Sequence, residues 1–230
     1  QKLPARLEET HIRKLGVEIA KFHKASLRAG KSIPKSSKSL KSDINHLLEI
    51  LETEQGQFEH RGHIDILKNQ CQIFLTNIQK LGLSSFDLMP VFVDWNIGNF
   101  SITEECKLYS RWDYDWFRMS SRMMDFYFFS RVVSDIGDRD EFSYVIGPLM
   151  EDRFLMFLEE YHQIYPLTIN EIYFLKEAYR FFILNYVIKY GKYFFHRAYC
   201  DKLQREAYEI YFPSIENFDA EKIINHLKMI

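Results

Sequence analysis

The amino-acid sequence predicts a mainly α-helical fold with a small β island near its middle. Two observations carry this prediction. Apolar residues recur at helical spacing along most of the 230 residues, and residues 89–116 differ from the rest in being β-branched and aromatic with short polar breaks. The hydrophobic fraction is 47% and the aromatic fraction 16%, which is ample apolar material for the core of a domain.

The helical segments follow one another along the chain. A helical period predicts a first helix over 6–28, ended by Gly30, and a basic, serine-rich loop with Pro34 then covers 31–42. The next helix is expected to begin at Asp43 as its N-cap, and the one after it to end at Gly82 as its C-cap. The later expected helices span about 43–53, 63–81, 120–136, 139–163, 168–198, 201–211 and 217–228.

The β island is expected to hold a short strand, a loop and a hairpin. The stretches MPVFVDW, NFSIT and KLYSRWD supply the strand-forming residues, and the hairpin is expected to turn at Thr103-Glu104-Glu105. In the helix that follows, the aromatic run Phe126–Phe129 extends around all sides, which predicts a helix that is buried on most sides.

Composition narrows the classes of partner. The formal net charge is −2, so no overall field favours nucleic acid or an anionic membrane. No run of about 18 apolar residues indicates a transmembrane helix. Three widely spaced cysteines argue against a disulfide framework and a zinc site. We therefore expect a cytoplasmic protein with no nucleic-acid or membrane partner.

Aspartate and asparagine side chains gather in and just after the β island. Asp94 is followed five residues later by Asn99, and then come Asp113, Asp115 and Asp125. Phosphoryl transfer uses one carboxylate to accept the proton of the attacking hydroxyl, and an amide oxygen and a second carboxylate to hold Mg²⁺. Asp and Asn are also common turn residues, so the spacing alone leaves a purely structural role open.

Four segments resemble the catalytic lobe of aminoglycoside phosphotransferases, choline kinases and their relatives. FVDWNIGN resembles the H-G-D-x-x-x-x-N loop, which implies that Asp94 is the catalytic base and Asn99 a metal ligand. RWDYDW resembles the next motif, whose aspartate binds Mg²⁺; spacing favours Asp113, and the immediate neighbours favour its rival Asp115. SSRMMDF resembles D-P-x-x-D-L, with Asp125 on its second aspartate. Because Asp125 lies in an apolar helix between Met124 and Phe126, we expect it to be buried, hydrogen-bonded and supporting the loop. LGVEIAKFHKAS resembles the helix that begins this lobe.

The resemblance implies that residues 1–230 are the helical C-terminal lobe of a protein kinase-like fold. The ATP-binding N-terminal lobe is expected to be absent from this chain, so ATP binding should be weak and self-association through the uncovered face is expected. The implied reaction transfers the γ-phosphoryl group of ATP, with Mg²⁺, to a hydroxyl of a small molecule.

Departures from the motifs leave alternatives open. Phe92 and Val93 stand for the His and Gly of H-G-D, and Ser121 and Arg122 for the first Asp and the Pro of D-P-x-x-D. Two other hypotheses are a kinase-like pseudoenzyme and a helical interaction module without a ligand site.

Overall fold

The computed structural model describes residues 6–34, 38–135 and 143–229, and it confirms a mainly α fold with a small β island. The α-helices are α1 (Glu9–Gly30), α2 (Leu40–Glu52), α3 (Glu54–Glu59), α4 (Ile64–Lys80), α5 (Met123–Val133), α6 (Asp152–Ile164), α7 (Ile169–Phe182), α8 (Gly191–Phe194), α9 (Arg197–Glu206), α10 (Phe212–Ser214) and α11 (Ala220–His226). Short 3₁₀ segments are η1 (Leu83–Ser85), η3 (Gly147–Met150) and η6 (Ile215–Asn217), and π-helical segments are η4 (Ile183–Lys189) and η5 (Ala207–Tyr211).

The strands form two small antiparallel pairs. β1 (Met89–Val91) pairs with β4 (Arg118–Ser120), and β2 (Phe100–Ile102) pairs with β3 (Leu108–Arg111). The second pair is the predicted hairpin, with the backbone N–H of Thr103 donating to the carbonyl of Lys107. β4 lies beyond the predicted strands and has only three residues. The two pairs hold both ends of the segment 92–99, which connects β1 to β2.

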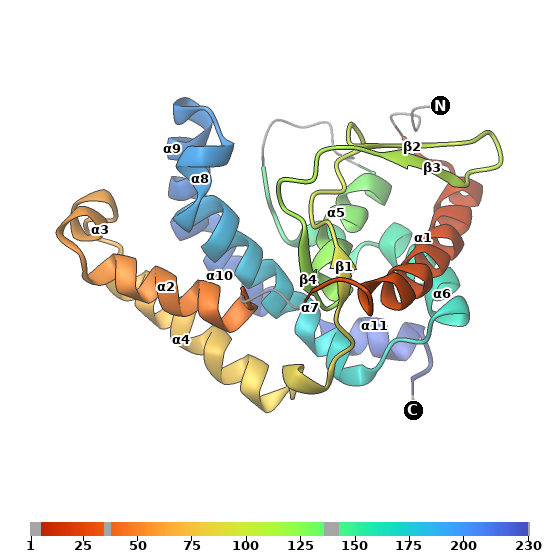
Figure 1. Ribbon diagram of the computed structural model, residues 1–230, viewed down its shortest axis with the longest axis horizontal. Helices are drawn as coiled ribbons and strands as arrows, with labels where there is room; N and C mark the ends of the chain where they lie inside the picture. The colour runs from red at the N-terminus through yellow and green to blue at the C-terminus, as the bar shows by residue number, and fades with distance from the viewer. Residues whose placement is uncertain (1–5, 35–37, 136–142, 230) are drawn as a thin grey trace.

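The helices lie on two sides of the molecule (Figure 1). α2, α3 and α4 lie on one side together with α8 and α9, and α1, α6 and the strands lie on the other. α7 contacts both α4 and α5, so it joins the two sides. α5 is the central helix, because all of its residues are buried. The prediction that its aromatic run is enclosed on most sides is thereby confirmed.

Several predicted helix ends differ from those observed. α2 begins at Leu40, where Ser39 and Ser42 form a capping box, so Asp43 is not the N-cap. The helix predicted over 139–163 begins only at Asp152, because η3, which contains Pro148, precedes α6. Residues 139–142 of this prediction lie outside the described part of the chain. The helix predicted over 168–198 widens into η4 and is interrupted at Tyr190 before α8. The described residues contain no helix that combines the length and the apolar character of a membrane span.

Candidate active site

The segment 92–99 is a tight loop whose sharpest turn is at Val93. This residue has φ 63°, in the left-handed region that β-branched residues rarely adopt. The backbone N–H of Asp94 donates to the carbonyl of Phe92 at 2.7 Å, and that of Trp95 to the carbonyl of Val93 at 3.0 Å. The left-handed residue Val93 stands at the position of the motif glycine.

Asp94 and Asn99 contact each other across this loop. The amide Nδ2 of Asn99 donates to Oδ2 of Asp94 at 3.0 Å, and the backbone N–H of Asn96 donates to Oδ1 of Asp94 at 3.3 Å. Because the amide nitrogen is turned to Asp94, the amide oxygen of Asn99 lies on the opposite side of its amide group. A carboxylate and an amide oxygen are hard donors of the kind that Mg²⁺ prefers, so the donor set fits this metal.

The carboxylate of Asp125 supports the loop through hydrogen bonds to its backbone. Its Oδ1 accepts hydrogen bonds from the backbone N–H groups of Phe92 at 2.9 Å and Val93 at 2.7 Å. Its Oδ2 lies 3.1 Å from Nε2 of His23, whose Nδ1 lies 2.8 Å from the hydroxyl of Tyr161. Asp125 and His23 are fully buried. The carboxylate on α5 therefore connects the loop to α1 and α6, which is the placement that a supporting role requires.

Arg111 is a residue of the site that the sequence reasoning missed. Its guanidinium donates to the backbone carbonyls of Asp94 at 3.0 Å and Asp113 at 2.5 Å, and it lies 4.3 Å from the ring centroid of Phe92. Burial lowers the pKa of Arg111, and the nearby carboxylates of Asp125, Asp94 and Asp113 oppose this. An arginine remains protonated at neutral pH despite such a shift. The positively charged side chain of Arg111 thus connects the loop to the residues that follow β3. In the sequence, Arg111 is marked only as a basic residue two positions before Asp113.

The two rivals for the second metal ligand lie in different surroundings. Asp113 is exposed and has φ 64°, and its Oδ1 accepts a hydrogen bond from the backbone N–H of Asp115 at 3.3 Å. The bridge by Arg111 places the backbone of Asp113 next to that of Asp94. Asp115 is also exposed, and it lines a cavity beyond the loop. Arg111 therefore brings the backbone of Asp113 close to that of Asp94, whereas Asp115 lies in the wall of a cavity.

The departures at Ser121 and Arg122 have a structural counterpart. Arg122 is buried and pairs with Glu171 through Nε at 2.7 Å, and its Nη2 donates to the carbonyl of Pro166 at 2.6 Å. Burial is the largest single influence and lowers the pKa of Arg122, but the hydrogen bonds and charges of Glu171 and Tyr161 together outweigh it, so the net shift of the pKa is upward. Arg122 therefore attaches the start of α5 to the loop before α7.

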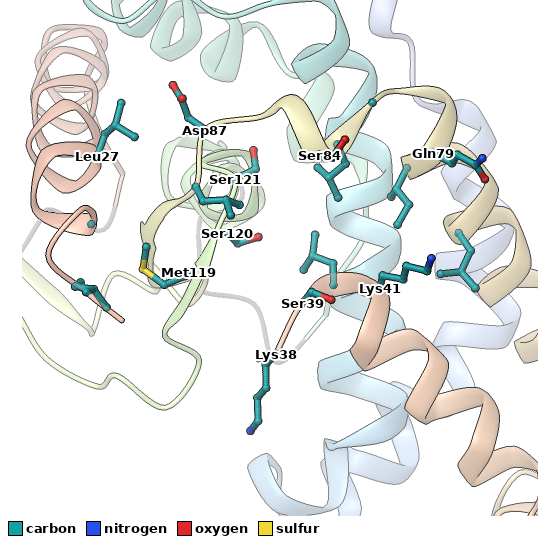
Figure 2. A pocket seen from close by; sticks show the side chains of 18 of the residues that line it. Leu27, Lys38, Ser39, Lys41, Gln79, Ser84, Asp87, Met119, Ser120 and Ser121 are labelled. Atoms are coloured by element: carbon teal, nitrogen blue, oxygen red, sulfur yellow. The ribbon is translucent and has the colours of Figure 1, made fainter. Parts of the chain in front are cut away.

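Two cavities lie beside the site. The larger, of about 1010 Å³, is formed by the ends of α1 and β4 on one side and by α2 and α4 on the other; Figure 2 shows Asp87, Ser120 and Ser121 across from Ser39 and Lys41. The smaller, of about 470 Å³, is lined by Asp115, Arg118 and several aromatic residues. The two share Ile33, Lys38 and Met119 in their walls, so they adjoin.

In the described part of the chain, no three His, Cys, Asp or Glu side chains form a metal cluster.

Comparison with known proteins supports the fold. No protein-family model and no curated protein matches the sequence. An aminoglycoside phosphotransferase from Alicyclobacillus acidocaldarius is similar in structure, with a TM-score of 0.53 and 13% sequence identity; the match covers 100% of this chain and 70% of that chain. At this identity the likeness concerns the fold. The chain therefore has a mainly α fold that resembles the C-terminal lobe of an aminoglycoside phosphotransferase.

Proposed function

We propose that this chain is the catalytic and substrate-binding lobe of a kinase of the aminoglycoside phosphotransferase and choline kinase type. The observation that carries the proposal is the contact between Asp94 and Asn99 on a loop that Asp125 supports and Arg111 connects to Asp113. This arrangement lies in a fold that resembles a phosphotransferase. The co-substrate would be ATP and the acceptor a hydroxyl of a small molecule.

In the proposed reaction, Asp94 orients the acceptor hydroxyl and takes its proton. The hydroxyl oxygen forms a bond to the γ-phosphorus of ATP while the bond from that phosphorus to the β–γ bridging oxygen breaks, and ADP leaves with the electron pair. The amide oxygen of Asn99 and the carboxylate of Asp113 would hold Mg²⁺, which neutralises charge on the phosphates. The positive charge of Arg111 lowers the cost of gathering these carboxylates around an anionic substrate.

A pseudoenzyme is the second candidate, and Arg111 is the observation that favours it. Its guanidinium already supplies a cation between the backbones of Asp94 and Asp113. A resident cation so close to the predicted metal ligands would weaken Mg²⁺ binding by like-charge repulsion. The protein would then bind a ligand in the adjoining cavities without transferring phosphate.

Four variants of the whole protein that carries these residues distinguish the candidates. Asp94→Asn should retain MgATP binding, measured by calorimetry, and lose phosphoryl transfer from γ-labelled ATP. Asn99→Ala and Asp113→Asn should weaken MgATP binding, and Asp115→Asn is the matched control that should not. Retained transfer in Asp94→Asn would refute the assignment of the base. A larger effect of Asp115→Asn than of Asp113→Asn would reverse the metal ligands, and wild-type protein that binds no MgATP would favour the pseudoenzyme.

We also propose that a second lobe, outside residues 1–230, covers the nucleotide. The 230 residues alone should then bind MgATP weakly and self-associate through the face that this lobe covers. Tight MgATP binding by these residues alone would contradict the division into lobes. We propose a cytoplasmic location and neither a nucleic-acid nor a membrane partner, in keeping with the near-neutral charge.

A further inference from the structure

The smaller cavity has a mainly aromatic wall next to the loop that carries Asp94. Its rings are Trp116, Phe117, Tyr186, Tyr190, Tyr193 and Phe194. Phe117 contacts Phe92 of the loop, with ring centroids 5.5 Å apart. At about 470 Å³ the cavity is within the usual range of small-molecule sites, and it adjoins the larger, mostly apolar cavity. A molecule bound here would contact Phe117, which packs on the loop, and would have room for an apolar body.

The charges of this cavity do not favour a cationic ligand. Asp43 is the buried carboxylate in its wall, and Arg118 donates to it at 2.8 Å while Nζ of Lys189 lies 3.5 Å away. The side chains of Arg118 and Lys189 are themselves 9% and 1% exposed, so these charges are held in place. The wall also contains Lys38 and the exposed Asp115, which carry one charge of each sign. A polycation would therefore find no excess of negative charge.

Asn185 supplies a hydrogen-bonding group that the protein itself does not use. It lines the cavity, is 3% exposed, and its Oδ1 has no hydrogen-bond donor among the described residues. An unpaired buried polar atom is destabilising, so its retention calls for an explanation such as a ligand. Asn185 also lies in the π-helical segment η4, and π-helical turns are frequent at functional sites. A ligand with an N–H or O–H group would satisfy this oxygen.

We infer that the cavity takes an uncharged, ring-bearing alcohol that stacks on its aromatic wall and donates a hydrogen bond to Asn185. The inference rests on the proposed function only in calling this ligand the phosphoryl acceptor. The aromatic wall favours a ligand with a flat or ring-shaped body, because rings stack on one another. The balanced charges of the wall give a cation no required role. The unpaired Oδ1 of Asn185 favours a ligand that carries a hydrogen-bond donor. Asn185 is the residue that determines this specificity.

The test measures binding without nucleotide, so that it is independent of catalysis. Saturation-transfer NMR on the full protein would compare two neutral ring alcohols, salicin and uridine, with two cations, kanamycin and choline. At least one neutral probe should bind, and more tightly than either cation. Asn185→Leu should weaken that binding by about tenfold, the worth of one hydrogen bond to a buried polar group. Tyr193→Ala, which removes a ring that is 83% exposed and so spares the fold, should also weaken it.

The thermal midpoint separates a binding role of Asn185 from a structural one. Replacing an amide whose buried oxygen is unpaired with leucine should leave the thermal midpoint of the free protein unchanged or raise it. Asn225→Leu on α11, outside both cavities, is the matched control and should change neither binding nor the midpoint. A lower midpoint in Asn185→Leu, unchanged binding in that variant, tighter binding of a cation, or no binding of either neutral probe would overturn the inference. Neutral binding by a protein that transfers no phosphate would instead refute the proposed function and leave this inference standing.

Discussion

Replacing Asp125 with alanine should destabilise the protein far more than an average substitution. The change removes the acceptor for two backbone N–H groups, those of Phe92 and Val93, and the partner of Nε2 of His23. Each buried group left unpaired costs about 1–3 kcal/mol, and the three share one carboxylate, so we expect a total loss of about 3–6 kcal/mol. For a chain of this size, that corresponds to a fall of about 10 °C or more in the thermal midpoint.

Urea unfolding followed by circular dichroism measures this loss, and two further variants make it specific. Asp125→Asn keeps an acceptor for both N–H groups and requires only that His23 change tautomer, so it should lose only about 1–2 kcal/mol. Asp201→Ala, whose side chain is 71% exposed on α9, should stay within about 0.5 kcal/mol of wild type. A loss below about 1 kcal/mol in Asp125→Ala would show that the loop keeps its shape without the carboxylate, and the supporting role would be refuted.

Three other substitutions test two features of the site and one buried histidine at the end of α3. Arg111→Met should cost about 1–2 kcal/mol in urea unfolding because it unpairs two carbonyls, whereas Arg197→Met, 93% exposed, should cost almost nothing; equal effects would contradict the bridge. Val93→Gly relieves a left-handed valine, so it should cost at least about 1 kcal/mol less than Val91→Gly, a buried valine in β1; an equal cost would mean that φ 63° carries no strain. Burial lowers the pKa of His60 from 6.5, so the unfolded chain binds a proton that the folded chain does not, and stability is lost as the pH falls below about 6.5. His60→Gln should flatten the fall of the thermal midpoint between about pH 7.5 and 5.5, and an unchanged slope would contradict this.

The sequence predicted those parts of the fold that depend on periodicity and local texture. The helical period of α1 and the β-branched island were sufficient for the fold class, because burial of apolar faces dominates both. Helix ends depend on single hydrogen bonds instead. Ser39 caps α2 because its side chain reaches the backbone of Ser42, and this leaves Asp43 to pair with Arg118 from β4. A long-range ion pair of this kind has no local signature.

The same distinction applies to the candidate site. Asp94 and Asn99 could be proposed from the sequence because their spacing is local, and the two side chains contact each other across one loop. Arg111 and Asn185 were missed because their importance depends on position in space: one bridges two backbone segments, and the other is an unpaired amide in a cavity wall. The role of Asp113 against Asp115 stays a prediction, because both follow β3 within a few residues and the motif fits either.

Phe92, which replaces the motif histidine, is weak evidence against catalysis once the contacts of Arg111 are considered. The aromatic ring of Phe92 carries no hydrogen-bonding nitrogen, yet it supports the guanidinium at 4.3 Å, and the guanidinium in turn donates to the carbonyls of Asp94 and Asp113. The two motif loops are therefore connected without a polar group at position 92. The charge that makes this connection is also the charge that opposes Mg²⁺, so the choice between enzyme and pseudoenzyme depends on metal affinity in the presence of Arg111. Arg111→Met, compared with wild type for MgATP binding, addresses that choice directly: tighter binding in the variant would favour the pseudoenzyme, and weaker binding would favour an enzyme whose arginine positions its metal ligands.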